Sequence, residues 1–268
     1  MDIRAQIKAE LERIERERGV CIVYACESGS RAWGFESANS DYDVRFLYLH
    51  PTEWYLRVTP GSDVIEPPIE GVLDMAGWDL CKALRLLKKS NLPLLEWLQS
   101  PLVYREHSSV VRRIRALMPQ YYQPVACHYH YLHMAQGNYR DFLRGDTVWL
   151  KKYFYVLRPV LACRWIERGY GVVPTEFRIL VERVLDEDDV RAAVQDLVRR
   201  KKAAEELDRG PHIPVLSSFL AREVDRLSAL PAPPASPTSG ARLDQVFRAC
   251  LIDIYGTEIR SVEDRPSA

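Results

Sequence analysis

The sequence has no apolar run that approaches the ~18 residues of a membrane-spanning helix, so we expect no membrane insertion. Its six cysteines form no CxxC pair, which removes the usual signal of a zinc ribbon or a thioredoxin-type site. The segment 1–19 has the pattern of a charged amphipathic helix and lacks the apolar centre of a signal peptide. These absences together predict a cytoplasmic protein.

The sequence also lacks an excess of charge of either sign, because 37 basic residues balance 37 acidic ones. A balanced total argues against a protein whose whole surface binds nucleic acid. A local basic face stays compatible with it, since net charge averages over the surface. The length of 268 residues fits one large domain or two small ones.

Residue patterns divide the chain into a mixed first part and a helical second part. Apolar or alternating runs predict strands at 20–25 and 42–49 and two more within 63–76, where Gly77 closes the last one. Apolar residues at helical spacing predict helices at 2–18, 78–90, 92–99 and 108–117. We find no convincing strand after Val103, and further helices are predicted at 121–144, 146–169, 176–185, 188–208, 216–229 and 242–255.

The predicted fold class is therefore α+β, with a small mixed domain over residues 1–118 and an all-helical domain over 119–228. The Pro/Ser-rich segment 229–241 has the composition of a linker. Residues 242–268 would form a short C-terminal helix and a tail.

Two carboxylates, Asp41 and Asp43, stand two positions apart at the start of the predicted strand 42–49. Side chains at this spacing point to the same face of a strand, so their oxygens come close and repel each other. A divalent cation removes the conflict, and Mg²⁺ is commonly held by one or two carboxylates together with substrate phosphates. We predict that Asp41 and Asp43 bind metal, although a solvated acidic turn would have the same spacing.

Gly29 and Ser30 lie between a buried strand and a predicted helical turn. Helix N-termini expose unpaired N–H groups, and glycine allows a phosphate to approach the backbone closely. Gly29 and Ser30 are thus predicted to hold a triphosphate. Two ions about 4 Å apart on the acidic pair would then neutralise the leaving pyrophosphate and activate an attacking hydroxyl.

A third carboxylate usually completes such a site, and the sequence offers two candidates. Asp74 is preferred because it lies on a later strand that can pair beside Asp41 and Asp43. Asp79 is the alternative, but it lies in the first turn of a predicted helix, where an acid serves as a cap or dipole partner.

The segment GSRAWGFESANSDYD resembles the GS…DxD signature of the DNA polymerase β superfamily of nucleotidyltransferases. More narrowly, SRAWGF before SDYDVRF, then LDMAGWDLCKAL and KKYFYVLRPVLACRWIE, resemble the YcgL-like branch, which is predicted to act in RNA repair beside ligases and polynucleotide kinases. The resemblance covers most of residues 20–175. It implies a minimal polymerase β-like catalytic domain and a helical domain that closes over the nucleotide. It also implies an NTP substrate, of which ATP is favoured, and two bound ions of Mg²⁺ or Mn²⁺.

The predicted function is transfer of an NMP from an NTP to an acceptor hydroxyl, with release of pyrophosphate. In this scheme Asp74 joins the metal ligands and helps to activate the acceptor. The resemblance favours an RNA 3′ end as acceptor. Two alternatives stay open: transfer of AMP to a protein hydroxyl, and a non-catalytic module that binds nucleotide or RNA.

Other residues near these motifs have two interpretations each. Arg31 would contact phosphate or lie on the surface, and Trp33 is expected to pack. A basic set in the helical half is predicted to share one helical face, which would meet the triphosphate or an RNA backbone, or simply face solvent. Its members are Lys151, Lys152, Tyr155 and Arg158.

A group of metal-ligand types also lies at the start of the predicted helix 121–144. It comprises Cys127, His128, His130 and His133. No second pair of Cys or His residues supplies the four ligands of a structural zinc site, so we predict none. A contact of His128 or His130 with nucleotide or acceptor stays open.

Overall fold

The computed structural model describes residues 2–59, 61–69, 71–203, 207–229 and 239–256, and it has the predicted α+β fold. Five strands form one mixed sheet in the order β3-β4-β2-β1-β5, in which β2 and β4 are parallel and the other neighbours are antiparallel. A separate pair of short strands, β6 and β7, lies among the later helices. The strands are β1 Cys21–Glu27, β2 Tyr42–Leu49, β3 Val64–Ile65, β4 Leu73–Asp79, β5 Val103–Glu106, β6 Val148–Trp149 and β7 Arg209–Gly210.

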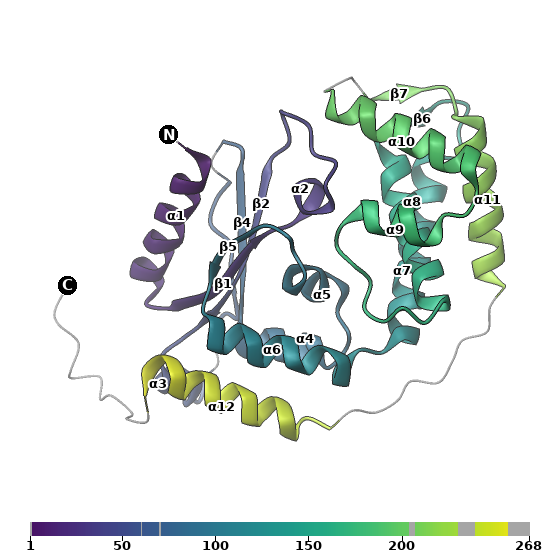
Figure 1. Cartoon of the computed structure of the whole chain (residues 1–268). Helices are drawn as coiled ribbons and strands as arrows, with labels where there is room; N and C mark the ends of the chain where they lie inside the picture. Colours follow the sequence, from purple (N-terminus) through teal and green to yellow (C-terminus); the bar gives the residue numbers. More distant parts are fainter. Residues whose placement is uncertain (1, 60, 70, 204–206, 230–238, 257–268) are drawn as a thin grey trace.

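The helices fall into two groups (Figure 1). The first group packs around the five-stranded sheet, and the second, α7 to α11, stacks beside it. The first group is α1 Ile3–Arg18, α2 Gly29–Trp33, α3 Thr52–Tyr55, α4 Leu80–Leu87, α5 Leu92–Leu98, α6 Ser108–Tyr121 and α12 Ala241–Tyr255. The second group is α7 Pro124–Phe142, the 3-10 turn η1 Leu150–Lys152, α8 Tyr153–Glu167, α9 Phe177–Val184, α10 Asp188–Lys202 and α11 Pro214–Ser228.

Helix α1 covers one face of the sheet, because its apolar residues recur at helical spacing. Ile7, Leu11 and Ile14 are buried against that face. The Asp2 side chain caps the first turn by accepting from the Arg4 N–H, and Gly19 ends the helix in the left-handed conformation. This helix therefore covers the sheet face that carries Val44, Phe46 and Tyr48.

Strand β2 alternates as its sequence predicts. Val44, Phe46 and Tyr48 belong to the core under α1, whereas Leu47 belongs to the core on the opposite face. That second core runs without interruption from the sheet through α4 to α6 and into α7 to α12. The two helical groups therefore share one hydrophobic interior.

Two predictions about strands are wrong. Gly77 does not close β4 but lies inside it, where a Cβ atom would come within 2.0 Å of the Phe46 ring. The strand needs a glycine there because this aromatic ring occupies the side-chain position. The expectation of no strand after Val103 is also wrong, because β5, β6 and β7 are present. Strand β5 gives little signal, since it is a short run of partly exposed residues without clean alternation.

Predicted helix boundaries fail where short strands intervene. The segment expected as helix 146–169 begins with β6 and η1, so α8 starts only at Tyr153. The helix expected over 188–208 ends at Lys202, because Arg209 and Gly210 pair with β6. Helix α6 runs through Pro119 to Tyr121, across the boundary expected between the two domains. Most of the predicted linker 229–241 and the tail after Gly256 lie outside the residues that the structure describes.

The C-terminal helix α12 packs against α4 and α6, on the sheet side of the molecule (Figure 1). Asp253 pairs with Arg113 at 3.1 Å, and the Tyr255 hydroxyl donates to the Leu49 carbonyl at 2.8 Å. Among the described helices, none has the length and apolar character needed to cross a bilayer.

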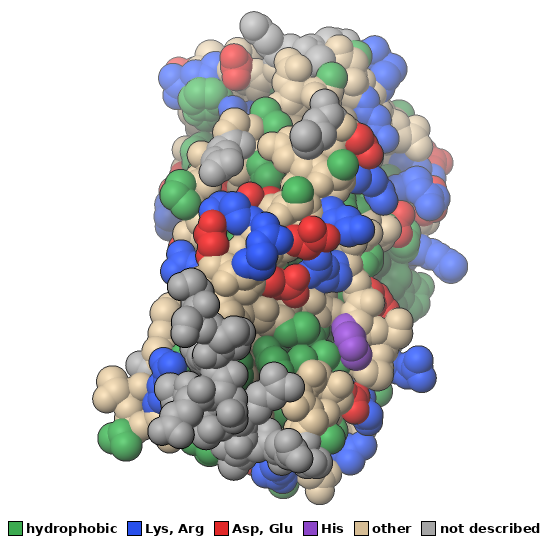
Figure 2. Space-filling view, turned by 90° about the vertical axis from the view of Figure 1, so that its left-hand side faces the viewer, with side chains coloured by type: hydrophobic (Ala, Val, Ile, Leu, Met, Phe, Trp, Pro, Cys, Tyr) green, Lys and Arg blue, Asp and Glu red, His purple; other side chains and the backbone are tan. Residues whose placement is uncertain are grey.

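Basic and acidic side chains are intermixed across the middle of the face that carries α1 (Figure 2). Ion pairs join Arg13 with Glu17 within α1, and Arg105 of β5 with Glu15 of α1. This view therefore gives no single-sign patch behind the sheet.

Candidate functional site

A cavity of about 380 Å³ opens where the β1–α2–β2 corner meets the helical part. Residues from both halves of the sequence line it, so neither half of the chain forms the cavity alone. Its walls are Gly29, Ser30, Phe35, Ser37, Asn39, Ser40, Asp41 and Asp43 on the sheet side, and Lys151, Phe154, Tyr155 and Lys201 on the helical side.

Gly29 begins α2 with a positive φ of 59°. A Cβ atom added there would lie 2.1 Å from Oδ2 of Asp43, far inside any permitted contact. The backbone at Gly29 and the carboxylate of Asp43 therefore occupy neighbouring space that only glycine leaves free. This close approach explains why glycine, and no other residue, fits before Ser30.

Asp43 and Asp74 face each other from adjacent strands. The parallel pairing of β2 with β4 sets these two residues in register, as the preference for Asp74 required. The guanidinium of Arg45 lies between them, with Nη2 at 3.1 Å from Oδ1 of Asp43 and 2.8 Å from Oδ2 of Asp74. Arg45 reaches both because it lies two positions after Asp43 on the same face of β2.

The charges around Asp43 act in opposite directions. Burial raises the pKa of its carboxyl, the nearby carboxylates of Asp74 and Asp41 raise it further, and the guanidinium of Arg45 lowers it. The shift that results is upward. A carboxyl in this environment is stabilised as an anion by any added positive charge.

The fully buried carboxylate of Glu27 supports the backbone at Asp43. Oε1 of Glu27 accepts the backbone N–H of Asp43 at 2.8 Å, and Oε2 accepts the hydroxyl of Tyr104. The backbone is fixed further because the Ser28 N–H donates to the Asp43 carbonyl at 2.8 Å. Burial raises the pKa of Glu27, against the effect of these two donors. Glu27 therefore holds the start of β2 in place.

Asp41 is exposed at the rim of the cavity, just before β2 begins. Arg31 fixes this loop, since its Nε donates to the Asp41 carbonyl at 3.1 Å and its Nη2 to the Ser40 carbonyl at 2.7 Å. Its guanidinium also stacks over the Tyr42 ring at 3.6 Å. Arg31 does not line the cavity, so its visible role is to order the loop that carries Asp41.

Asp79, the alternative third carboxylate, has a different task. Its side chain caps α4 by accepting from the Cys81 N–H at 2.8 Å, and it accepts the Tyr55 hydroxyl at 2.6 Å. It is buried with only 1% of its surface exposed. These contacts match the capping role considered for it and leave Asp74 beside Asp43.

The donor chemistry of the carboxylates suits a divalent cation, because Asp43 and Asp74 already share one positive charge. A ready-made triad is nevertheless not formed. Within the part of the chain that the structure describes, no three His, Cys, Asp or Glu side chains are grouped closely enough to hold an ion. The predicted set of Asp41, Asp43 and Asp74 is therefore not assembled: Asp41 and Asp43 line the cavity, Asp74 does not, and Arg45 lies between Asp43 and Asp74.

The helical wall of the cavity is basic and aromatic. Lys151 extends from η1 and Lys201 from the end of α10, and they face the cavity whose other wall carries Asp41 and Asp43. Burial lowers the pKa of Lys201, with a smaller contribution from the charge of Lys151. Tyr155 is 42% exposed and meets the Trp33 ring edge to face at 5.9 Å.

The expected helical face of Lys151, Lys152, Tyr155 and Arg158 is not formed, because η1 precedes α8 and changes the spacing. Lys152 lies outside the cavity lining, with its ammonium 4.4 Å from the Tyr155 ring centre. Arg158 is 2% exposed and pairs with Glu96 at 2.8 Å. Its guanidinium also covers Trp33, which packs as predicted, so Arg158 joins α8 to α5 and α2.

The Cys/His group of α7 is divided: Cys127 and His128 pack inside, whereas His130 and His133 are exposed. Cys127 is buried and its thiol donates to the Ser90 carbonyl, and Nε2 of His128 lies 3.6 Å from Glu167. His128 does not line the cavity, and neither does His130.

Three residues of the site were not singled out from the sequence: Arg45, Glu27 and Lys201. Arg45 could have been found, since it follows Asp43 at strand spacing. Glu27 depends on its contact with Tyr104 in β5, and Lys201 depends on how α10 packs, so neither leaves a local signal.

Comparisons with known proteins show the family to which the chain belongs. Residues 3–249 match the model of a family described as the RNA repair pathway DNA polymerase beta family. The YcgL protein of Bacillus subtilis (strain 168) is 48% identical over 225 residues, which cover 84% of this chain and 86% of the relative. A solved nucleotidyltransferase-like protein from Exiguobacterium sibiricum 255-15 is 13% identical, with a TM-score of 0.33, over 91% of this chain and 80% of the other. The family match and the YcgL relative show that this chain belongs to the DNA polymerase β family of RNA repair pathways.

Proposed function

We propose that the protein transfers a nucleotidyl group from an NTP to the 3′ hydroxyl of an RNA, and that ATP is the preferred NTP. The observation that carries the proposal is the division of charge across one cavity. Carboxylates line the sheet wall and two lysines line the helical wall. A triphosphate with its cation is the ligand that satisfies both walls at once.

The anionic part of the substrate would lie between Ser30 and the two ammonium groups. Ser30 supplies a hydroxyl beside the narrow space that Gly29 leaves. Lys201 is half-buried, so its positive charge is partly withdrawn from water, where it binds phosphate more strongly, and the exposed Lys151 adds a second ammonium group. Tyr155 offers an exposed aromatic surface next to them for the nucleobase.

The reaction forms a bond between the acceptor oxygen and the α-phosphorus and breaks the bond between the α- and β-phosphates. Pyrophosphate leaves, and the hydroxyl proton passes to a carboxylate, for which Asp74 is our choice. Asp41, Asp43 and Asp74 would hold Mg²⁺ or Mn²⁺, which neutralises phosphate charge and makes the acceptor hydroxyl more acidic when bound.

The choice of RNA as acceptor rests on the family to which the chain belongs. The cavity itself would accept the same nucleotide for transfer to a protein hydroxyl. An experiment must therefore present both acceptors together.

The test incubates the full chain with Mg²⁺ or Mn²⁺, each α-labelled NTP in turn, total RNA and cell protein. We expect label in RNA that requires a free 3′ hydroxyl, with wild-type protein only. Asp43→Asn and Asp74→Asn should each reduce transfer by about 100-fold or more, because each removes charge at the reacting phosphate.

The matched control is Asp225→Asn, which neutralises an exposed carboxylate on α11, outside the cavity lining. It should transfer label at the wild-type rate. Label in protein instead of RNA would replace the RNA acceptor by a protein hydroxyl. Nucleotide binding without any transfer would leave a binding module and remove the proposed reaction.

A further inference from the structure

Arg45 is held at the acidic pair by contacts with four oxygen atoms. Besides its bonds to the carboxylates of Asp43 and Asp74, its Nη1 donates to the carbonyl of Asp74 at 3.1 Å and to that of Val44 at 3.2 Å. Only 18% of the Arg45 side chain is exposed. The guanidinium is therefore built into the site and is not a surface charge that happens to lie nearby.

The position of Arg45 has an electrostatic reason. Two carboxylates in register on neighbouring strands repel each other, and a positive charge between them offsets that repulsion. A guanidinium keeps its charge at any pH in which the protein is folded. Arg45 thus offsets the repulsion between Asp43 and Asp74 and lets them stay close to each other.

The same oxygens are the ones that our proposed function gives to a divalent metal ion. A guanidinium and a metal ion repel each other and compete for the same lone pairs. Nη2 of Arg45 occupies one oxygen of each carboxylate, so an ion that takes these two oxygens must displace it.

We propose that Arg45 is a built-in competitor of the divalent metal ion, which holds Asp43 and Asp74 in the metal-free protein and yields them when the ion enters with a triphosphate. This inference rests on the proposed function, because it takes these carboxylates as metal ligands. It makes Arg45 a positioning residue that sets how tightly the protein alone binds metal. The triphosphate then supplies the extra negative charge that favours exchange of Arg45 for the ion.

The test measures Mn²⁺ binding to the full chain without nucleotide, from the electron paramagnetic resonance signal of free Mn²⁺. In Arg45→Gln the Kd for Mn²⁺ should fall by about tenfold or more, since a unit charge in contact with both carboxylates is gone. Arg45→Lys keeps the charge and should bind Mn²⁺ within about threefold of wild type. Arg178→Gln is the control, because Arg178 pairs only with exposed Glu182 on α9.

Three results would overturn the proposal. The first is an equal or weaker Mn²⁺ affinity in Arg45→Gln, including no binding in either protein. The second is tight binding that survives when Asp43→Asn is added to Arg45→Gln, because the ion would then occupy another place. The third is the same gain in Arg178→Gln, which would reflect overall charge.

A measurement on the wild-type protein makes the test independent of how the variants fold. The side-chain Nε–H resonance of Arg45, assigned by its absence from Arg45→Lys, should shift as Mg²⁺ and a non-hydrolysable ATP analogue are added together. A resonance that stays unchanged while Mg²⁺ and nucleotide bind would overturn the proposal. The label-transfer assay tests the proposed reaction separately. Label transfer without the changes in Mn²⁺ affinity and in the Arg45 resonance would remove only the Arg45 inference. Those changes without label transfer would remove only the proposed reaction.

Discussion

At the scale of single residues, the site depends on how little space separates Gly29 from Asp43. A methyl group at Gly29 has no room, because Oδ2 of Asp43 lies where it would point. The same glycine has a positive φ, which costs other residues about 1 to 2 kcal/mol. Space and backbone strain are therefore two separate costs at one position.

We expect Gly29→Ala to lose both stability and activity. The free energy of unfolding in urea should fall by about 1 to 2 kcal/mol from backbone strain, with a further loss from the contact with Asp43. Transfer of label should fall by about 100-fold, because the carboxylate is pushed from its place.

Gly34→Ala separates the two effects. Gly34 ends α2 with φ 85°, and an added Cβ atom would meet nothing within 4 Å. This variant should lose a similar amount of stability from strain but keep its transfer activity. Equal loss of activity in both variants would show that α2 matters only through its stability.

Much of the carboxylate arrangement follows from sequence spacing alone. Alternation along a strand brings Asp43 and Leu47 to one face, and the preference for Asp74 over Asp79 agrees with the observed strand pairing. The role of Glu27 could not be predicted, since its burial depends on β5, which the sequence barely signals. Sequence spacing puts Arg45 on the same face as Asp43, but its place between the two acids depends on the pairing of β2 with β4.

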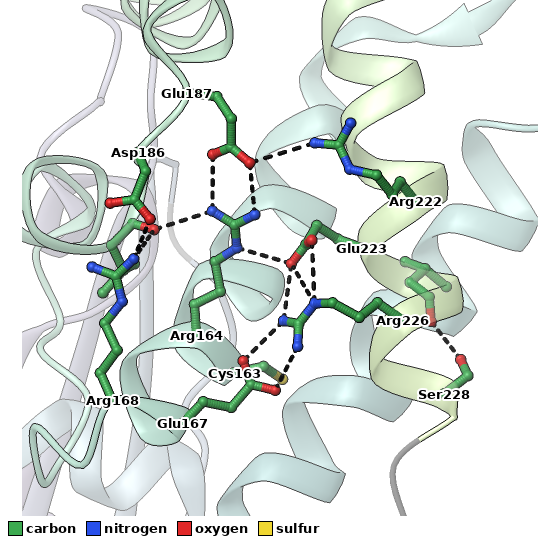
Figure 3. A network of polar contacts seen from close by, with 12 residues as sticks. Cys163, Arg164, Glu167, Arg168, Asp186, Glu187, Arg222, Glu223, Arg226 and Ser228 are labelled. Atoms are coloured by element: carbon green, nitrogen blue, oxygen red, sulfur yellow. Dashed lines mark hydrogen bonds and ion pairs between the residues drawn. The ribbon is translucent and has the colours of Figure 1, made fainter.

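At the scale of elements, ion pairs join α8, α10 and α11 (Figure 3). Arg164 of α8 contacts Glu187 at 2.9 Å and Glu223 at 2.8 Å, and Arg226 bonds both Glu223 and Glu167. Each acid is shared or bidentate, so the loss of one member affects several helices. The network fixes the helix bundle that carries the basic wall of the cavity.

This network predicts a loss of stability in acid. Hydrogen bonds from Arg164 lower the pKa of Glu187 to about 2, and for Glu167 bonds from His128 and Arg226 overcome the opposite effect of burial to reach about 2. Both values lie below the unfolded value of 4.5, so this stabilisation is complete above that pH. It is lost as the pH falls from there toward 2.

Unfolding in urea between about pH 7 and pH 3 measures the effect. The free energy of unfolding should fall more steeply below pH 5 in wild type than in Glu187→Gln, which cannot titrate. Glu182→Gln removes an exposed carboxylate that pairs with Arg178, and it should keep the wild-type slope. Identical slopes in all three proteins would contradict the assigned role of Glu187.

Helix α12 offers a second test at this scale, because one of its faces is buried and the other is not. Leu243 is 6% exposed, whereas Ile252 is 51% exposed. Leu243→Ala should lower the free energy of unfolding by about 2 to 3 kcal/mol. Ile252→Ala should change it by less than about 0.5 kcal/mol. A small effect from Leu243→Ala would mean that α12 is not docked in solution.

The prediction of elements succeeded where a pattern was long and failed where it was short. Helix α1 and strand β2 carry full periods of apolar residues, and both are present within a residue or two of the expected bounds. Strands β6 and β7 have two residues each and exist only because they meet across a long separation in the sequence. Their pairing moves the start of α8 to Tyr153 and so decides which basic side chains reach the cavity.

At the scale of the whole molecule, the cavity joins residues that lie far apart in the sequence. Lys201 contributes from α10, and Lys202 next to it is exposed outside the cavity lining. We expect Lys201→Ala to raise the Kd for ATP by about tenfold or more, as loss of a charge-assisted contact does. Lys202→Ala should bind ATP like wild type. Equal effects from both lysines, measured by calorimetry at low salt, would point to general charge attraction in place of a contact.

One hydrophobic interior runs through both helical groups and one face of the sheet. Swinging the helical part away from the sheet would expose that interior to water, which opposes a wide opening. The cavity is therefore already formed before any ligand arrives, and we expect little reorganisation of the protein on binding. Nucleotide entry should then be governed by diffusion and by the charge at the rim, so its rate will fall as ionic strength rises and will fall in inverse proportion to solvent viscosity.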